Sequence, residues 1–426
     1  MPFRIALSGL AAASADLKVT GNNIANAATT GFKQSRAEFA DVYAVAFGGT
    51  AKSQTGAGVR VANIAQQFTQ GSIEFSNRAL DLAVNGGGFF VVSEGQNQVF
   101  TRDGNFHVDN SGTVVNNYNQ PLKVFPVNGN GNISGQVSFN TGSLSNLQLT
   151  TTDGTPNPTS TVSAGLNLNA SAVVPTGADP SGNGSLFDPN DPTTYTSATS
   201  TIVYDSLGAE HTAAMYYEKT PTANTWNVFT VVDGYTAQQS NVSPVSITFD
   251  ANGRLITPAS GAINYDPITS ADLGISNNIA PLQLNVDYSN TTQFGTPFGV
   301  NSLSQDGFTS GRLTGVDVDP EGIVYARFTN GQSSALGKVA LANFANPQGL
   351  RQMGDTQWSQ TLESGSLVLG EAGTGSFGLL QSGALEASNV DIATSLVGLI
   401  TAQRNFQANA QVISTADTIT QTIINI

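Results

Sequence analysis

Few residues in this sequence have the types and spacing that catalysis or metal binding requires. The chain contains no cysteine and only two histidines, His107 and His211. The absence of cysteine excludes disulfides, thiolate zinc sites and cysteine nucleophiles. Each histidine lies in a predicted strand, in a spacing that forms neither a metal site nor a catalytic triad, so we interpret both as structural residues. The serines form no G-x-S-x-G nucleophile elbow.

Three short segments resemble ligand-binding loops only in part. The segment DVDPEG at 317–322 begins like a calcium loop, but Pro320 and the missing distal glutamate favour a β-turn. The segment DPNDP at 188–192 is interpreted as a proline-fixed turn, with a calcium loop as the alternative. The segment NGGGFF at 85–90 lacks the Lys-Ser/Thr pair of a phosphate loop and is followed by a strand. We therefore predict no catalytic, metal-binding or cofactor-binding residue and no enzymatic activity.

The charge of the chain argues against nucleic acid and anionic membranes as partners. The 426 residues carry a net charge of −14, and charged residues make up only 11% of them. Between Lys123 and Arg312 the basic residues are Lys219 and Arg254 alone. Binding to phosphate groups requires clustered lysine and arginine, which this segment lacks. No run of about 18 or more apolar residues occurs, so no membrane insertion is predicted.

Residues 388–426 predict one long helix, of about 35 residues and roughly 50 Å. Ser388 and Asn389 are suitable N-cap residues, and Asp391 adds a favourable negative charge in the first turn. Apolar residues recur in steps of three, four or seven at Ile392, Leu396, Leu399, Phe406 and Ile413, followed by a shifted run at Val412, Ala416, Ile419, Ile423 and Ile426. Such a slowly turning stripe is typical of a helix that pairs with other helices. An ordinary helix lying on a globular domain is the alternative.

The first residues also predict an amphipathic helix. Phe3, Leu7, Leu10, Leu17 and Ile24 fall on a three-four spacing in which Ser14 and Gly21 occupy the two intervening positions. Because the segment has one arginine and a run of small residues, a secretory signal peptide is the alternative. A signal peptide would contain a solid apolar block, whereas this stripe is periodic. We therefore expect the helix to remain on the mature protein.

Between the two helices the sequence predicts β-structure. From about residue 70 to 370, short alternating runs are separated by turn signals, among them Asp-Gly and Asn-Gly pairs, and successive turns are about 8 to 12 residues apart. This spacing is typical of β-sandwich or barrel-like domains. Tyr216, Trp226 and Phe229 are the predicted core of the segment 200–234. The proline-rich segment 177–195 is predicted to be a long exposed loop.

The predicted fold is multidomain and mainly β, with β-sandwich or barrel-like inner and outer domains and a coiled-coil-like base of N- and C-terminal helices. The expected parts are a helical base of 1–30 plus 385–426, a connector of 31–70 plus 371–384, an inner β domain of 71–145 plus 286–370, and an outer β domain of 146–285. This nesting brings the two ends of the chain together, as paired helices require.

Both ends of the chain resemble one protein family. Residues 6–43 are similar to the N-terminal signature of the bacterial flagellar axial proteins, which comprise rod, hook and hook-associated subunits. The match is carried by Asn22, Asn23, Ile24, Ala25, Asn26, Thr30, Gly31, Phe32 and Lys33. Residues 385–417 resemble the C-terminal signature, and 81–92, 100–115 and 322–350 resemble the inner β domain. The segment 200–234 is similar to the outer domain of the hook subunits in this family. The length of the chain also favours a hook subunit.

The resemblance implies a structural hook subunit that self-assembles into a curved, tubular helical polymer. Such a polymer is a universal joint, which transmits torque from the motor and rod to the filament. The terminal helices would form an inner tube around the export channel. The implied polymer interface consists of Phe3, Leu7, Leu10, Leu17, Ile24, Ile392, Leu396, Leu399, Phe406, Ile413, Ile419 and Ile423.

Partners, location and alternatives follow from the same resemblance. The implied partners are further copies of the chain, the distal rod protein, the hook cap protein, the hook–filament junction protein and the type III export apparatus. The implied location is the hook outside the cell surface, reached by export without a cleaved signal peptide. The alternatives are a distal rod or other axial subunit and, in a different class, a secreted β-rich enzyme or adhesin.

Overall fold

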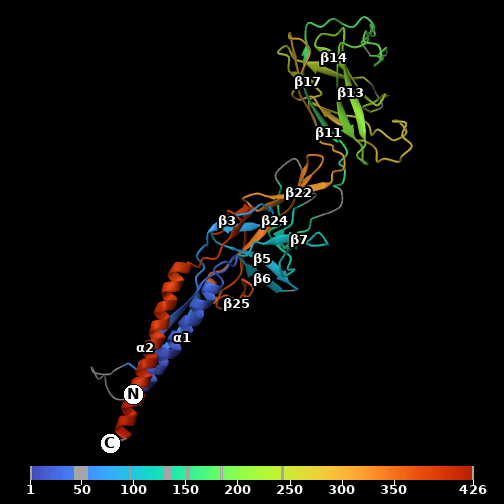
Figure 1. Ribbon diagram of the computed structural model, residues 1–426. Helices are drawn as coiled ribbons and strands as arrows, with labels where there is room; N and C mark the ends of the chain where they lie inside the picture. The colour runs from blue at the N-terminus through green and yellow to red at the C-terminus, as the bar shows by residue number, and fades with distance from the viewer. Residues whose placement is uncertain are drawn as a thin grey trace. The chain divides into compact units, whose positions relative to one another are not determined.

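The computed structural model describes residues 2–42, 56–95, 97–128, 137–149, 154–182, 184, 186–240 and 244–424. The fold is mainly β, with one long helix near each end of the chain (Figure 1). The chain divides into two compact units. Unit 1 comprises Met1–Thr151, Thr314–Arg327 and Ser333–Ile426, and unit 2 comprises Thr152–Leu313 and Phe328–Gln332. None of the helices among the described residues is long and apolar enough to span a membrane.

Both helices belong to unit 1 and lie against each other. They are α1 (Pro2–Ala25) and α2 (Ile392–Ile424). The helices are antiparallel, because Gly9 of α1 approaches Asn409 of α2, whereas Thr20 approaches Gly398. Figure 1 shows this pairing: the N-terminal end of α1 and the C-terminal end of α2 lie at the same end of the helix pair. The predicted coiled-coil-like base is therefore present.

The N-cap of α2 differs from the prediction. Asp391 Oδ1 accepts the backbone N–H of Thr394 at 2.7 Å, so Asp391 is the N-cap rather than Ser388 or Asn389. Asn389 instead donates from Nδ2 to the backbone carbonyl of Gln67 at 2.8 Å. Capping preference alone does not distinguish Asn389 from Asp391. Asn389 does not cap the helix because its side chain is hydrogen-bonded to a distant segment of the chain.

Most strands of unit 1 form a single large sheet. The strands of this unit are β1 (Ser35–Asp41), β2 (Val59–Gln66), β3 (Ile73–Phe75), β4 (Leu82–Asn85), β5 (Phe89–Glu94), β6 (Asn97–Thr101), β7 (Phe106–Val108), β8 (Val114–Asn116), β9 (Lys123–Phe125), β10 (Ser145–Asn146), β22 (Leu313–Val318), β23 (Ile323–Phe328), β24 (Ser333–Asn343), β25 (Arg351–Gly354), β26 (Gln357–Ser359), β27 (Val368–Glu371), β28 (Leu379–Ser382) and β29 (Ala384–Glu386), with a 3₁₀ turn at Pro347–Gly349. Ten of them form one sheet, whose main order is β10-β9-β24-β5-β6-β26-β25, with β22, β23 and β27 attached. Three two-stranded sheets, β28–β4, β29–β3 and β7–β8, complete this β region. The strands β1 and β2 form a separate antiparallel hairpin within the segment predicted as a connector.

Aromatic side chains form the core of the large sheet. Phe89 and Trp358 pack with ring centroids 5.6 Å apart, and Phe100 and Phe344 pack at 4.8 Å. The Trp358 Nε1 donates to Gln66 Oε1 at 2.5 Å. This hydrogen bond ties the end of the β1–β2 hairpin to the aromatic core.

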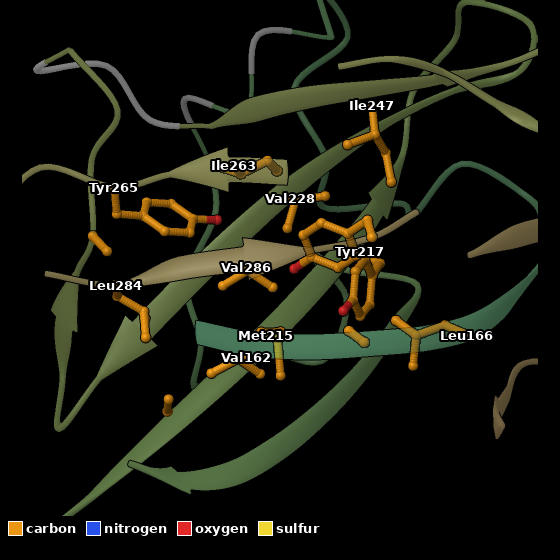
Figure 2. Packing of buried hydrophobic residues seen from close by; sticks show 14 of the residues in the cluster. Val162, Leu166, Met215, Tyr217, Val228, Ile247, Ile263, Tyr265, Leu284 and Val286 are labelled. Atoms are coloured by element: carbon orange, nitrogen blue, oxygen red, sulfur yellow. The ribbon is translucent and has the colours of Figure 1, made fainter. Parts of the chain in front are cut away.

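Unit 2 is a sandwich of two sheets. Its strands are β11 (Thr161–Asn169), β12 (Ser197–Tyr204), β13 (Glu210–Lys219), β14 (Thr225–Val232), β15 (Tyr235–Thr236), β16 (Val245–Phe249), β17 (Leu255–Thr257), β18 (Ala262–Asn264), β19 (Asn285–Asp287), β20 (Thr292–Phe294) and β21 (Gly299–Gln305). One sheet has the order β12-β13-β14-β16-β17 with β15 on β14, and the other is built around β11. Side chains of both sheets, among them Leu166 of β11 and Tyr217 of β13, point into one shared core (Figure 2).

The structure changes two assignments made for unit 2. Residues 286–313, assigned above to the inner domain, belong to unit 2, because β19, β20 and β21 all hydrogen-bond to β11. The segment 177–195 is a loop with many exposed residues, as predicted, but part of it packs on the sheet. Phe187 from this segment stacks on Phe229 with centroids 3.8 Å apart. Its aromatic residues are the physical reason, since they cover apolar side chains on the outer face of β14.

Of the three residues predicted as the core of the segment 200–234, two are buried, and only Trp226 belongs to the core shared by the two sheets. Trp226 and Phe229 are buried. Tyr216 is only half-buried, and Tyr195 covers it at a centroid distance of 4.8 Å. Its neighbour Tyr217 enters the core, because successive strand residues point to opposite faces of a sheet.

Alkaline pH is expected to unfold unit 2. Burial raises the pKa of Tyr265 to about 12, against an ordinary value of 10.0, and burial also raises the pKa of Tyr217 and Tyr288. The folded state therefore holds these protons more tightly than the unfolded state. The stability that they contribute is complete below pH 10 and is lost as the pH rises from 10 through about 12. Tyrosinate absorbance and circular dichroism, recorded together during an alkaline titration, measure this transition.

The control for the alkaline titration is Tyr265→Phe. Removal of this hydroxyl removes one proton-linked group, so the unfolding transition should become less steep with pH. Ionisation of all ten tyrosines near pH 10 with no loss of β-structure would contradict the expectation.

Candidate functional site: the terminal helices and their junction

The fully buried residues in the contact between α1 and α2 are small. Ala6 and Ala13 of α1 and Ala402 of α2 are buried. A Cβ atom on Gly9 would lie 2.5 Å from Asn409 Oδ1, so glycine lets Asn409 occupy its position without displacement. Small residues allow two helix axes to approach closely, but they bury little apolar surface.

The covered residues of the two helices follow a heptad pattern. On α2, the set Ser395, Leu399, Ala402, Phe406, Asn409, Ile413 and Ala416 is buried or half-buried, in alternating steps of four and three. On α1, the set Ala6, Leu10, Ala13, Leu17, Thr20 and Ile24 repeats these steps. This is the period of a coiled-coil seam. The two sets therefore form one antiparallel, coiled-coil-like contact.

The structure divides the predicted interface residues between two faces. Leu10, Leu17, Ile24, Leu399, Phe406 and Ile413 are half-buried and belong to the heptad sets. Phe3, Leu7, Ile392, Leu396 and Ile419 are exposed over 46% or more of their surface. The side chain of Ile423 lies outside the described residues. The apolar stripes therefore cover both the contact between the helices and a second, open surface.

Further exposed apolar residues extend this open surface. They are Ile5, Val397, Ile400 and Val412. The sequence analysis did not include Ile5, Val397 and Ile400, because it assigned one stripe to each helix. In a sequence, two apolar faces on one helix look the same as one wide apolar face.

An open apolar groove lies where α2 passes the start of α1. Phe3 lines the groove from α1, and Ala408, Val412, Ala416 and Ile419 line it from α2. Its volume is about 850 Å³. Contiguous exposed apolar surface of this kind typically marks an interaction site.

Another face of α1 lies against the β1–β2 hairpin. Ser8 Oγ accepts the backbone N–H of Val59 at 3.2 Å. The side chain of Asn23 exchanges two hydrogen bonds with the backbone of Ser35, at 2.7 and 2.9 Å. The helix α1 is therefore held on two sides, whereas most of α2 away from α1 is exposed.

A buried ion cluster joins the end of α1 to the start of α2. Lys33 Nζ lies 2.5 Å from Glu386 Oε1, and Arg102 Nη1 lies 3.0 Å from Glu386 Oε2. These side chains are 1%, 6% and 0% exposed for Lys33, Arg102 and Glu386. Lys33 also donates to the carbonyl of Thr69, and Glu386 accepts the N–H of Gly71. We refer to Lys33, Arg102 and Glu386 as the junction.

Backbone contacts strengthen the same connection. The N–H of Gly31 donates to the carbonyl of Glu386 at 2.8 Å. Gly31 has a φ of 69°, and a Cβ atom there would lie 2.5 Å from the backbone nitrogen of Asp103, so glycine is required. Asn389 Oδ1 accepts the N–H of Gln34 at 2.8 Å.

The electrostatics of the junction depend on Glu386. Burial lowers the pKa of Lys33 and of Arg102, and the nearby carboxylate of Glu386 opposes this by raising both. Two cations thus face one carboxylate in a site with little access to water. Removal of the partner of a buried charge is strongly destabilising.

The structure places the N-terminal motif around this junction. Asn22, Asn23, Ile24 and Ala25 end α1, Asn26 and Thr30 lie in the following turns, and Gly31, Phe32 and Lys33 are buried. Sequence reasoning named Lys33 without its partners. It missed Arg102 and Glu386, because Lys33 and Glu386 lie 353 positions apart and no local pattern links them.

A matched pair of glycine substitutions is expected to have opposite effects. In Gly71→Ala, the new Cβ atom would lie 2.0 Å from the carbonyl oxygen of Ala387, which must then shift beside the junction. We expect a loss of about 1–3 kcal/mol in the free energy of unfolding. In Gly21→Ala the Cβ atom meets nothing within 4 Å, and alanine favours a helix by about 1 kcal/mol. Thermal unfolding followed by circular dichroism measures both, and equal shifts would contradict the expectation.

The two histidines have structural surroundings. His211 is buried, with Nδ1 at 2.7 Å from Asp233 Oδ2 and Nε2 at 3.4 Å from Asp205 Oδ2. His107 lies half-buried in β7. Within the described part of the chain, no group of three or more His, Cys, Asp or Glu residues could hold a metal ion.

Both acidic segments form turns. Asp319 Oδ1 accepts the N–H of Ile323 at 2.7 Å, and the Asp319 carbonyl accepts the N–H of Gly322 at 3.0 Å. The turn joins β22 to β23, as predicted. In the segment 188–192, Asp188 Oδ1 accepts the N–H of Asn190 at 2.9 Å. Its carboxylates thus serve local turns.

Four family models match segments that span most of the chain. "Flagella basal body rod protein" matches residues 3–33, and "Flagellar hook protein FlgE/F/G D1 domain" matches 83–153. "Flagellar basal body protein FlaE D2 domain" matches 167–308, and "Flagellar basal body rod FlgEFG protein C-terminal" matches 381–426. The terminal helices, the inner β region and unit 2 therefore have the domain series of flagellar axial proteins.

Among the flagellar axial proteins, the relatives that match over the full length of the chain are hook proteins. The flagellar hook protein FlgE of Escherichia coli strain K12 is 37% identical over 430 residues, with 100% of each chain covered. The FlgE proteins of Salmonella typhimurium and Rhizobium meliloti are 36% and 33% identical, over 100% of this chain and 100% and 98% of theirs. The crystal structure of Helicobacter pylori flagellar hook protein FlgE2 has a similar fold, with a TM-score of 0.51 at 14% identity, over 74% of this chain and 100% of that one.

The chain belongs to the flagellar hook protein FlgE family. It is a structural subunit of the bacterial flagellar hook, and its location is the flagellum.

Proposed function

We propose that copies of this chain assemble through the exposed apolar faces of α1 and α2 into the curved, tubular polymer of the hook. The observation that carries this proposal is the set of apolar side chains that the α1–α2 contact leaves exposed, such as Leu7, Leu396 and Ile419. Their burial against a neighbouring copy would contribute about 25 cal/mol per Å². The helix α2 has Arg404 and Asp417 as its charged residues, so little charge repulsion opposes close packing of copies.

The proposed polymer assigns a place to each part of the chain. The terminal segments 1–30 and 385–426 form the inner tube around the export channel. The segments 31–70 and 371–384 connect this tube to the β regions, which form the outer layers. The polymer bends as a universal joint that passes torque from the motor and rod to the filament. Few charged residues at the β surfaces would leave few fixed ion pairs to resist the sliding of neighbours.

The proposal includes the partners and the route of export. Its partners are further copies of the chain, the distal rod protein, the hook cap protein, the hook–filament junction protein and the type III export apparatus. Export takes place without a cleaved signal peptide, and the periodic stripe of α1 supports this. The role is structural rather than enzymatic and uses no cofactor.

Electron microscopy of the purified chain at rising concentration and salt tests the proposal. We expect curved tubes from the full chain and none from a variant that lacks residues 392–426, because the open face of α2 is then missing. Straight tubes would indicate a rod-like polymer instead. Tubes formed by the shortened variant, or no polymer from the seeded full chain, would contradict assembly through the helices.

A further inference from the structure

The segment 177–195 covers a buried carboxylate as well as aromatic side chains of unit 2. Glu218 of β13 is 2% exposed and lies directly opposite Asn227 of β14. The Asn227 Nδ2 donates to Glu218 Oε2 at 2.9 Å and to the carbonyl of Gly182, within the segment, at 3.0 Å. Glu218 is therefore enclosed between the sheet and the segment that packs on it.

This enclosure leaves Glu218 with little to stabilise a negative charge. Within the part of the chain that the structure describes, Glu218 accepts a single hydrogen bond, from the neutral Asn227 amide, and forms no ion pair. The ammonium group of the adjacent Lys219 lies 4.9 Å from the centre of the Trp226 ring instead. Successive strand residues point to opposite faces of a sheet, so Lys219 does not approach Glu218. Buried carboxylates are ordinarily paired with a cation or bound by several donors, so a charged Glu218 is unfavourable here.

A second carboxylate lies close to Glu218. Asp179, within the segment, is 9% exposed, and its Oδ1 accepts the N–H of Ser181 at 2.9 Å. Burial raises the pKa of Glu218 above its ordinary value of 4.5, the hydrogen bond from Asn227 opposes this, and the charge of Asp179 adds to it. The closed segment therefore binds the proton of Glu218 more tightly than an open segment would.

We propose that Glu218 is a pH-sensitive latch: protonated Glu218 keeps the segment 177–195 packed on the sheet, and ionisation of Glu218 loosens it. The carboxyl group is raised in pKa, so the stability that the latch contributes is complete below the ordinary value of 4.5. That stability is lost as the pH rises through the raised pKa of Glu218. The charged group that faces Glu218 from the segment is Asp179, and the group that contacts it from β14 is the neutral Asn227.

Opening of the latch would uncover aromatic surface on unit 2. Phe187 would leave its stack on Phe229, and Tyr195 would leave Tyr216. Contiguous apolar surface typically marks an interaction site, so contacts made by this face would depend on pH. A role for this face in the polymer rests on the function proposed above. The latch itself concerns unit 2 of the isolated chain, so its test does not depend on assembly.

Hydrogen exchange of the dilute full-length chain, between about pH 4.5 and 8 and corrected for the intrinsic exchange rate of each amide, tests the latch. Peptides from 177–195 should show an opening constant that rises at least about threefold with pH, whereas peptides from β14 should change by less than about twofold. Glu218→Gln keeps an acceptor for the Asn227 amide and carries no charge. In this variant the opening constant of the segment should keep its acid value at every pH.

The matched control is Glu210→Gln. Glu210 lies on the same strand, β13, but its side chain is exposed. Its substitution should leave the pH dependence of the segment unchanged. An opening constant that is constant or falls as the pH rises would overturn the proposal. The same holds for a Glu218→Gln chain that keeps the pH dependence, a Glu210→Gln chain that loses it, or an equal change in β14.

Discussion

Leu396→Ser is expected to raise the concentration at which the full chain polymerises by roughly 3- to 10-fold. Leu396 is 46% exposed on the open face of α2, so close to half of its surface is free for contact with a neighbouring copy. In the polymer a neighbour would cover the exposed part, which is about half of the side chain, so the gain is about half of the roughly 1.5–3 kcal/mol that full burial of a leucine contributes. Each 1.4 kcal/mol corresponds to about a tenfold change in the association constant. Sedimentation of polymer from monomer over a range of concentrations measures the effect.

The matched control for Leu396→Ser is Gln403→Ser. Gln403 is also exposed on α2, but it contributes a polar side chain. Its substitution should shift the polymerisation threshold by less than about threefold, because surface changes of this kind are usually within 0.5 kcal/mol. Circular dichroism should show the same helix content for both variants. A Leu396→Ser chain that polymerises at the unsubstituted threshold would show that the open face of α2 is not a polymer contact.

Trp226→Ala is expected to lower the free energy of unfolding of unit 2 by about 3–5 kcal/mol. Trp226 is fully buried between the sheets of the sandwich, and its Nε1 donates to Gln293 Oε1 at 3.3 Å. The Lys219 Nζ also lies 4.9 Å from the centre of its ring. Removal of the ring leaves a large cavity and a buried amide oxygen without its donor, and both effects destabilise the fold.

Denaturant unfolding can separate this effect from unit 1. The chain has two tryptophans, Trp226 in unit 2 and Trp358 in unit 1. In Trp226→Ala the remaining fluorescence reports on unit 1, and far-ultraviolet circular dichroism reports on both units. We expect an early β-structure transition and an unchanged Trp358 transition. Val173→Ala, at a side chain that is 83% exposed, should change neither. A simultaneous shift of both transitions would mean that the two units unfold as one.

The helices and the β character of this chain were predictable because both depend on local periodicity. An apolar residue every three or four positions marks one side of a helix, as at Leu10 and Leu17. Turn residues between alternating runs mark the ends of strands, as at Asp319, whose side-chain and backbone oxygens both accept hydrogen bonds within a turn. The family signatures could also be recognised from the sequence, because each consists of residues that are neighbours in the chain.

The face on which a residue is buried was less predictable. Tyr216 and Tyr217 are adjacent, and only the second enters the core of unit 2. Phe229 is covered on the outer face of its sheet by Phe187, from a segment whose prolines suggested exposure. The composition of the segment 177–195 favoured exposure. A single aromatic side chain, Phe187, nevertheless packs part of this loop against the sheet.

The sequence by itself determined the class of the protein, its helical ends, its β-rich middle and the motif that contains Lys33. The tertiary structure alone decided that residues 286–313 join unit 2, that the apolar stripes of the helices divide into covered and open faces, and that Lys33 meets Glu386 and Arg102. The physical reason is range. Periodicity, capping and turn preference act over a few residues and can be read along the chain. Strand pairing and a buried ion cluster depend on distant segments, and they exist only once the folded chain has brought those segments together.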